Sequence, residues 1–466
     1  MRGNSLYEKL KKYEASDFYG FHMPGHKRNT ELMGQGLPYG IDITEIDGFD
    51  DLHHADGILL ELEQRIAKLY GADRSRILIN GSTAGIMSAI LGCVDRGGKL
   101  LVARNCHKSV YHAALLGNLK THYIYPQPAD QMLINGPILA SDVEKELKEH
   151  QDIQAVFLTS PTYDGVVSDV RAIAEVVHKK NLPLIVDEAH GAHFPFSAYF
   201  PEDSIKSGAD VVIHSVHKTL PSLTQTALIH LNGNLVDRQK IRYFLSVYQT
   251  SSPSYVLMAG IDQCMEWTAS HLAEFDAFGE RLDRFRDRIQ NLQAIKLLEV
   301  PGMDRSKILL SAAGRGVTGQ ELAELLRKQW KIEMEMACST YACAITTVAD
   351  REEDLSRFAE ALEELDRMLA ACPEQRLKER EMDTVIPTGQ IFRIAQAFQR
   401  ETCEREIKNA EGAVSGGFVM PYPPGVPLLV PGERINRKVL DRLMVYLEEG
   451  LTVYGVHKGK IELLKE

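Results

Sequence analysis

The sequence predicts an α/β protein built around a mostly parallel, doubly wound sheet with a second, smaller domain. Between residues 76 and 231, short aliphatic and β-branched runs alternate with helical segments, the pattern of such sheets. The 466 residues are enough to bury a large core. With 44% apolar and 25% charged residues, the composition is that of a globular protein, which excludes disordered and fibrous classes.

The charge and the cysteines restrict the partners and the compartment. Against 53 Lys and Arg stand 64 Asp and Glu, a net charge of −11, which offers no attraction to nucleic acid or anionic membranes. None of the seven cysteines forms a C-x-x-C pair, and no apolar run approaches the roughly 20 residues of a membrane helix. The first 18 residues indicate an amphipathic helix and not a signal peptide. We therefore expect a cytoplasmic protein whose partner is a small molecule.

The large domain starts with a helix. Apolar residues recur at helical spacing over 58–69, and Gly71 stands where the helix should stop. The strands that follow are predicted at 76–79, 99–103, 121–125, 154–158, 182–187, 210–214 and 226–231, with helices at 84–94, 108–117, 141–149 and 169–180. Sheets of this kind bind ligands at the carboxyl ends of their strands, so we expect the functional residues to lie at those ends.

The second half predicts a smaller region. A long helical stretch, with a break, covers about 255–292. Strands are then expected at 307–311, 331–336 and 342–348, and helices at 319–329 and 351–369. The apolar Pro/Gly-rich segment 421–433 indicates an ordered, buried loop. The predicted division is an N-terminal arm over 1–55, a large domain over 56–290 and a smaller C-terminal α/β region over 291–466.

Two strand ends carry groups suited to covalent and ionic chemistry. Lys218 follows the strand 210–214, and burial there would free its amine for imine formation; a solvated surface lysine is the plain alternative. Asp187 ends the strand 182–187 and could pair with a pyridinium nitrogen. A metal site of Asp187, His190 and His193 is the alternative there, although no further ligands stand at convincing spacing.

Two other strand ends suit an anion and a flat ring. Asn80–Gly85 begins a helix with two hydroxyl residues, Ser82 and Thr83, which favours a phosphate cradle, or else an ordinary helix cap. His107 follows the strand 99–103 and could stack on a planar ring, or serve the fold alone. Phosphate anchor, ring platform, carboxylate and amine are together what pyridoxal phosphate requires, so we predict this cofactor.

One dinucleotide-binding pattern has a structural explanation. Residues 314–319 match G-x-G-x-x-G between a predicted strand and a predicted helix. Thr318 and Glu321 at the start of that helix form a capping-box pattern, which accounts for the segment without a nucleotide.

Several longer segments resemble the bacterial ornithine/lysine/arginine decarboxylase family, in its short subgroup without an N-terminal receiver-like domain. They are FHMPGHKRN (21–29), GIDITEIDGFDDLHHADG (40–57), NGSTAGI (80–86), ARNCHKS (103–109), DEAHGAH (187–193), HSVHKTLPSLTQTA (214–227) and YPPGVPLLVPGE (422–433). The chain departs from the family's lysine signature at Ile213 and at Pro221–Ser222, where small residues are usual.

The resemblance implies a fold, an activity and an assembly. The fold would be the aspartate-aminotransferase-like fold type I of pyridoxal phosphate enzymes. The activity would be a carboxy-lyase acting on arginine, lysine or ornithine and releasing CO₂ with agmatine or a diamine, as in polyamine biosynthesis. The assembly would be a homodimer or a larger homo-oligomer with shared active sites.

The resemblance also implies residue roles. Lys218 would form the imine with the cofactor, Asp187 would hold the proton of the ring nitrogen, and His107 would stack on the ring. Other cofactor contacts would come from Ser82, Thr83, Ala189, His190, Ser215 and His217, with Ser251 and Ser252 donated by a second subunit. His217 or Lys218 would return the proton to Cα.

The cation at the far end of a basic substrate needs an anionic partner. Glu433 in the apolar tail segment is the first candidate, with Asp42, Asp47 and Asp51 as alternatives. The plain explanation is that Glu433 caps a terminus. The sequence does not rank the three substrates, although the short subgroup favours arginine or lysine.

Three other functions compete with this interpretation. The first is another fold type I enzyme, such as an aminotransferase or a β-eliminating lyase, in which Arg393 could hold the substrate carboxylate. A hydrolase or metal enzyme and a non-enzymatic homologue are the other two.

Overall fold

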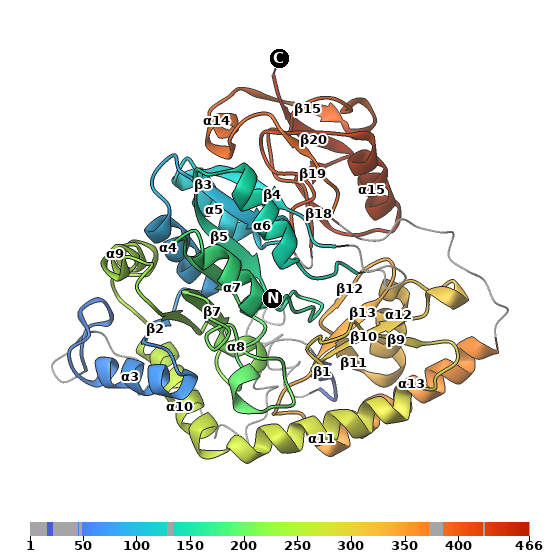
Figure 1. Ribbon diagram of the computed structural model, residues 1–466. Coiled ribbons are helices and arrows are strands. Elements are labelled where there is room, and N and C mark those ends of the chain that lie inside the picture. The colour runs from blue at the N-terminus through green and yellow to red at the C-terminus, as the bar shows by residue number, and fades with distance from the viewer. Residues whose placement is uncertain are drawn as a thin grey trace, which may run out of the picture.

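The computed structural model describes residues 16–21, 45, 49–127, 134–371, 385–422 and 425–465. Figure 1 shows these residues as a large α/β domain, a second unit built on a smaller sheet, and a C-terminal unit beside β3 and β4 of the large domain. Within these ranges, no helix has the length and apolar character needed to span a membrane.

The large domain is built on a seven-stranded sheet, counted over the described residues. Its order is β2 (Arg74–Leu78), β8 (Ala227–Leu231), β7 (Val211–Ser215), β6 (Leu184–Asp187), β5 (Ile153–Thr159), β3 (Lys99–Ala103) and β4 (Lys120–Ile124). Only β8 runs against its neighbours. This confirms the predicted fold class, and it brings the carboxyl ends of β3, β5, β6 and β7 to one edge.

Helices cover both faces of this sheet because its strands are apolar on both sides. In β6, Leu184 and Val186 join one hydrophobic cluster, whereas Ile185 joins the other. The first cluster is closed by α3 (Ile58–Tyr70), α6 (Ala140–Glu149), α7 (Val170–His178) and α10 (Tyr255–Ser270). The second is closed by α4 (Gly81–Cys93), α5 (Lys108–Leu116) and α9 (Arg238–Tyr248). The helix α3 stops at Gly71, whose φ of 72° gives it the left-handed end that the sequence predicts.

The predicted long helix is broken at His271. Beyond it, α11 (Leu272–Ile289) places Phe275 and Phe278 in the core of the large domain and Phe285 in that of the second unit. The helix therefore joins the two units, as Figure 1 shows along its lower edge.

The second unit has an antiparallel sheet of β12 (Met336–Ala337), β13 (Ala342–Ile345), β10 (Lys307–Ser311) and β9 (Lys296–Leu298). The helices α12 (Gly319–Leu325) and α13 (Glu352–Ala370) close its core. The strand predicted over 331–336 divides into β11 (Ile332–Met334), which pairs with β1 (Tyr19–Phe21), and β12. Thr318 and Glu321 form the predicted capping box at the start of α12.

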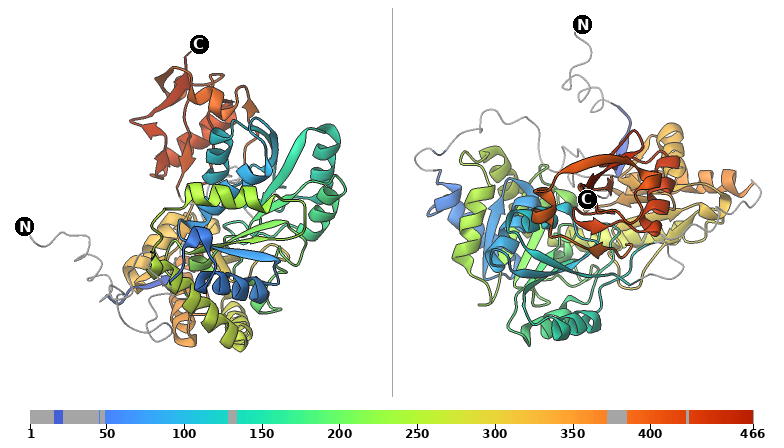
Figure 2. Two further views of the ribbon diagram at one scale, coloured as in Figure 1. Left: turned by 90° about the vertical axis from the view of Figure 1, so that its left-hand side faces the viewer. Right: turned by 90° about the horizontal axis from the view of Figure 1, so that it is seen from above.

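The C-terminal unit has a hydrophobic cluster of its own, within the predicted region 291–466. Its elements are β14 (Gly389–Gln390), α14 (Ile394–Phe398), β15 (Thr402–Glu406), β16 (Met420–Pro421), β17 (Glu433–Arg434), α15 (Arg437–Glu448), β18 (Val453–Tyr454), β19 (Val456–His457) and β20 (Lys460–Leu464). Figure 2 gives two further views of this unit against the large domain.

Candidate active site

Lys218 lies in α8 (Val216–Thr219), a single helical turn directly after β7. Its Nζ is 3.0 Å from Nε2 of His190. Burial lowers the pKa of Lys218, and the nearby carboxylate of Asp187 partly opposes that effect. An amine with a lowered pKa is a better nucleophile at neutral pH, so the position suits imine formation.

Asp187 ends β6, opposite Ile213 of the parallel strand β7. Its side chain is buried and accepts a hydrogen bond of 3.1 Å from the backbone N–H of Ala189. Burial raises the pKa of Asp187, whereas the charge of Lys218 and this hydrogen bond lower it. A buried carboxylate of this kind is stabilised further by a cationic ligand group.

His107 stands at the N-terminus of α5, where Nδ1 accepts hydrogen bonds from the backbone N–H (3.3 Å) and hydroxyl (2.9 Å) of Ser109. Since Nδ1 accepts, a neutral ring carries its proton on Nε2. Burial and the positive charge of Lys218 lower the pKa of His107 to about 3, so the ring is uncharged at neutral pH. A fixed, flat, neutral ring beside Lys218 suits stacking.

The start of α4 lies beside the end of β7. The Ser82 hydroxyl hydrogen bonds to that of Ser215, while Thr83 is exposed in the same helical turn. The side chain of the N-cap residue Asn80 makes no capping hydrogen bond and donates instead to the Tyr248 carbonyl at 3.1 Å. Uncapped N–H groups and hydroxyls at a helix N-terminus favour an anion.

The other residues predicted to contact the cofactor or a metal have the following positions. His217 donates through Nδ1 to the Thr226 carbonyl at 2.9 Å, and Ala189 is buried beside Asp187. Ser251 and Ser252 are exposed between α9 and α10. His193 lies 3.4 Å from Asp304 whereas His190 faces Lys218, so the two histidines have different partners.

Glu433, the first candidate for the substrate cation, has another partner. Its fully buried carboxylate accepts from Arg104 (3.0 Å from Nη2) and from the Val430 N–H (2.9 Å). Arg104 is also fully buried and donates to the Pro427 carbonyl at 2.7 Å. The ion pair holds the tail segment against the end of β3, so we withdraw Glu433 as the cation partner.

The alternatives to Glu433 are not favoured either. Asp51 accepts hydrogen bonds from the His53 backbone N–H and from the His54 ring. Asp42 and Asp47 lie outside the described residues. Arg393, considered above for an aminotransferase, stands at the N-cap of α14 in the C-terminal unit.

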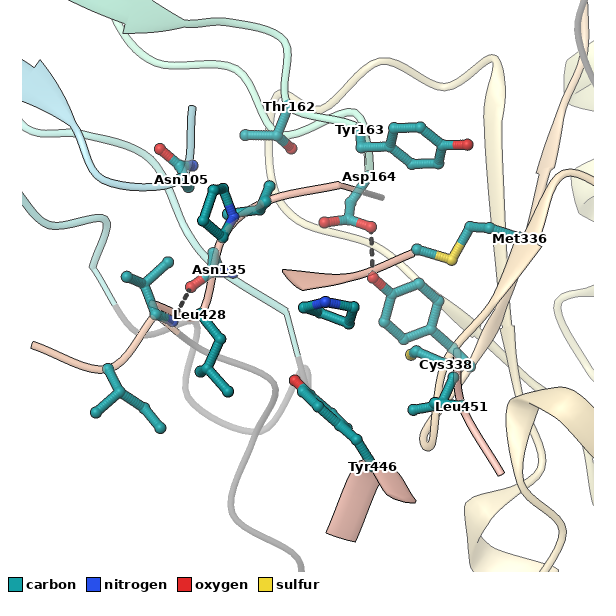
Figure 3. A pocket seen from close by; sticks show the side chains of 16 residues that line it. Asn105, Asn135, Thr162, Tyr163, Asp164, Met336, Cys338, Leu428, Tyr446 and Leu451 are labelled. Carbon is teal, nitrogen blue, oxygen red and sulfur yellow. Dashed lines mark hydrogen bonds between the residues drawn. The ribbon is translucent and has the colours of Figure 1, made fainter. Parts of the chain in front are cut away.

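A pocket that the sequence did not predict lies between the three units (Figure 3). Its lining residues include Asn105, Thr162, Tyr163 and Asp164 from the large domain, Met336, Cys338 and Tyr341 from the second unit, and Leu428, Tyr446 and Leu451 from the C-terminal unit. The Tyr163 ring packs edge-on to that of His190, with centroids 4.9 Å apart, which links the pocket to Lys218. Residues 162–164 follow β5 at the same sheet edge, so their position after a strand was the signal that could have identified them.

Two carboxylates and one amide oxygen supply acceptors at or beside this pocket. The Tyr341 hydroxyl donates to the Asp164 carboxylate (Figure 3), and the Tyr163 hydroxyl donates to Glu335. The Oδ1 atom of Asn105 is buried without a hydrogen-bond partner in the described part of the chain. The charge of Glu335 opposes the lowering of the Lys218 pKa, so this carboxylate acts on the amine.

A buried chain of hydrogen bonds lies behind Asp187. Glu188 contacts His214 Nε2 at 2.7 Å, His214 Nδ1 lies 3.1 Å from His230 Nε2, and His230 Nδ1 lies 2.7 Å from the Ser75 hydroxyl. Burial lowers the pKa of His214 to about 4, so the ring is neutral near pH 7. Each neutral ring then donates a hydrogen bond through one nitrogen and accepts one through the other, so the hydrogen bonds between Glu188 and Ser75 all run in the same direction.

Two family descriptions match the sequence: the Orn/Lys/Arg decarboxylase major domain over residues 4–304 and the C-terminal domain of that family over 382–454. An arginine decarboxylase of Bacillus subtilis (strain 168) is 29% identical, with 99% of this chain and 97% of that protein aligned. An arginine decarboxylase of Bacillus anthracis is 30% identical, with 99% and 96% aligned.

A lysine decarboxylase structure from Francisella novicida matches with a TM-score of 0.77 at 18% identity, over 99% of this chain and 81% of that one. These comparisons confirm the resemblance and the fold class that the sequence predicts.

Replacing His214 tests the buried chain of hydrogen bonds. His214→Leu removes one buried hydrogen bond from Glu188 and one from His230, so we expect the free energy of unfolding to fall by about 2 kcal/mol or more. Urea denaturation measures this value. His54→Ala removes the exposed histidine of the Asp51–His54 pair and should change it by less than about 0.5 kcal/mol. Equal, small losses in both variants would show that the buried chain contributes nothing.

Proposed function

The chain belongs to the Orn/Lys/Arg decarboxylase family, and from this premise we propose that it is a pyridoxal phosphate-dependent carboxy-lyase acting on a basic L-amino acid. The observation that carries the proposal is the grouping of Lys218, Asp187 and His107 at the ends of β7, β6 and β3. Electrostatic effects of Lys218 on both other groups support that grouping. Among basic amino acids we propose arginine, because relatives aligned over nearly their whole length are named arginine decarboxylases.

The residues present fit the cofactor. His190 Nδ1 is buried beside Lys218 with no hydrogen-bond partner in the described ranges, as expected where a bound group completes a site. Lys218 would hold the aldehyde carbon, Asp187 the ring nitrogen and His107 one ring face, with Ala189 on the other. The start of α4, Ser82, Thr83, Ser215 and His217 would hold the phosphate. When bound, pyridoxal phosphate supplies a conjugated ring that accepts the electron pair left by departing CO₂.

The protein groups position and move protons. The Asp187 carboxylate would stabilise a proton on the ring nitrogen of the bound cofactor, and burial of the site would strengthen that interaction. His190 orients the Lys218 amine through their contact of 3.0 Å. The Nδ1 proton of His217 is held by the Thr226 carbonyl at 2.9 Å. We therefore assign the return of a proton to Cα to Lys218.

The pocket suits the cationic end of the substrate. Asp164 lines it, Glu335 acts on Lys218 across Tyr163, and Asn105 adds an unpartnered acceptor. A guanidinium or ammonium group has only hydrogen-bond donors, so these acceptor groups complement it. We propose that Asp164, in place of Glu433, pairs with the distal cation.

We also propose a homodimer with shared active sites. Ser251 and Ser252 are exposed on the single chain, as residues that complete a neighbour's site would be before assembly. Sedimentation velocity of the cofactor-loaded enzyme tests this assembly, and a monomer that is fully active would contradict it.

Product analysis tests the activity. The purified protein is incubated with pyridoxal phosphate and, in turn, arginine, lysine and ornithine, while CO₂ and amine products are quantified. We expect CO₂ and agmatine from arginine, and no product from Lys218→Ala because the amine that binds the cofactor is absent. A keto acid product would favour an aminotransferase, and no reaction with any of the three would reject the proposed activity.

Steady-state kinetics tests the cation partner. Asp164→Asn removes the charge that faces the distal cation, so we expect KM for the basic substrate to rise by about tenfold or more while kcat changes less. Tyr341→Phe is the matched control, because it removes the hydrogen bond to Asp164 and leaves the carboxylate. An unchanged KM in Asp164→Asn, or an equal rise in Tyr341→Phe, would reject this role.

A further inference from the structure

Three side chains with metal-binding atoms meet at the outer edge of the large sheet. His122 projects from β4, the edge strand, while Glu146 and His150 stand four residues apart at the C-terminal end of α6. Residues four apart share one face of a helix, which explains why both reach the same point. One ligand atom of each side chain lies within 4.8 Å of the others.

The carboxylate of Glu146 lies between the two imidazoles. His122 Nε2 is 2.6 Å from Glu146 Oε2, and His150 Nε2 is 3.8 Å from the same oxygen. The two imidazole rings are tilted by 55° relative to each other, with their centroids 3.9 Å apart. The three side chains are between 21% and 32% exposed, so they are partly held by packing and still open to an ion from solution.

We propose that His122, Glu146 and His150 bind one divalent transition-metal ion of the Zn²⁺ type. Two imidazole nitrogens and a carboxylate oxygen are an established donor set for Zn²⁺, with water in the fourth position. Ligand atoms about 2.1 Å from a tetrahedral ion lie about 3.4 Å apart, which small side-chain rotations reach from the present separations. Imidazole nitrogen is a preferred ligand of Zn²⁺ and similar transition-metal ions, whereas Ca²⁺ and Mg²⁺ prefer oxygen ligands.

The proposed metal site is separate from the candidate active site. In the sheet order, β4 is the fourth strand from β7, which corresponds to about 19 Å at the usual strand spacing. An ion here would not touch the groups around Lys218. The ion would link the edge strand β4 to α6, which places Val143 and Leu147 in the hydrophobic core. A ligand bound only by the folded state stabilises that state.

The sequence gives little sign of this site. Glu146 and His150 form a common i,i+4 pair, and the second histidine comes from a strand 24 residues before the glutamate. Only the packing of α6 beside β4 brings the third ligand to the other two.

Titration of the chelator-treated, cofactor-loaded protein with ZnCl₂ tests the proposal. We expect calorimetry to show one ion per chain, and Co²⁺ to give the intense visible absorption of a tetrahedral site. His122→Gln and His150→Gln should each weaken Zn²⁺ binding by about 100-fold or more, since each removes one of three ligands. The thermal midpoint should rise with Zn²⁺ in the parent protein and not in these variants.

The control is His178→Gln. His178 also pairs with a carboxylate, that of Asp210, at 2.8 Å. Among the described residues, however, it belongs to no group of three metal-binding side chains. This variant should bind Zn²⁺ as the parent does, and enzyme turnover without added metal should be unchanged in His122→Gln and His150→Gln. Absence of binding in the parent would overturn the proposal, as would equal Zn²⁺ affinity in the parent and both ligand variants.

Discussion

The buried electrostatic pairing of Asp187 with Lys218 is the constraint on which the site depends. Burial raises the pKa of the carboxyl and lowers that of the amine, and each charge opposes the shift of the other. The parallel register of β6 and β7, which places Asp187 opposite Ile213, brings the two groups together. Because side chains alternate along a strand, a slip of one residue would turn Asp187 to the opposite face and separate them.

A buried ion pair between Arg104 and Glu433 joins the C-terminal unit to the large domain. Arg104 and Glu433 are both fully buried, and removing either would leave an uncompensated charge in the interior, which costs about 3–5 kcal/mol in typical proteins. Arg104 also holds the carbonyl of Pro427, so one side chain fastens the loop that ends in Glu433. The tail segment thus becomes a wall of the pocket at Asn105, and Glu433 contributes to the site by holding that wall in place.

Local patterns predicted the strands and singled out candidate groups near their ends, but they did not predict the contacts between units. The run 99–103 coincides with β3 because a strand buried on both faces is apolar throughout. Lys218, Asp187 and His107 were predicted because each directly follows or ends such a run. The Arg104 partner of Glu433 was not foreseen because it lies 329 residues away, a separation that periodicity does not span. The strand predicted over 331–336 divides at Glu335, whose side chain contacts Tyr163 of another unit.

The shape of the pocket depends on contacts that hold the second unit against the loop after β5. The Asp304 backbone N–H donates to the Gly165 carbonyl at 2.8 Å, and Lys307 Nζ lies 2.7 Å from the Asp304 carboxylate. Gly165 has a φ of +89°, and an added Cβ there would stand 2.8 Å from Lys307 Cγ, so only glycine permits this approach. The same loop carries Tyr163 and Asp164. The residues proposed to select the substrate are therefore held by packing between units, whereas those proposed to bind the cofactor are held by one sheet, so the two sets can vary independently on the same fold.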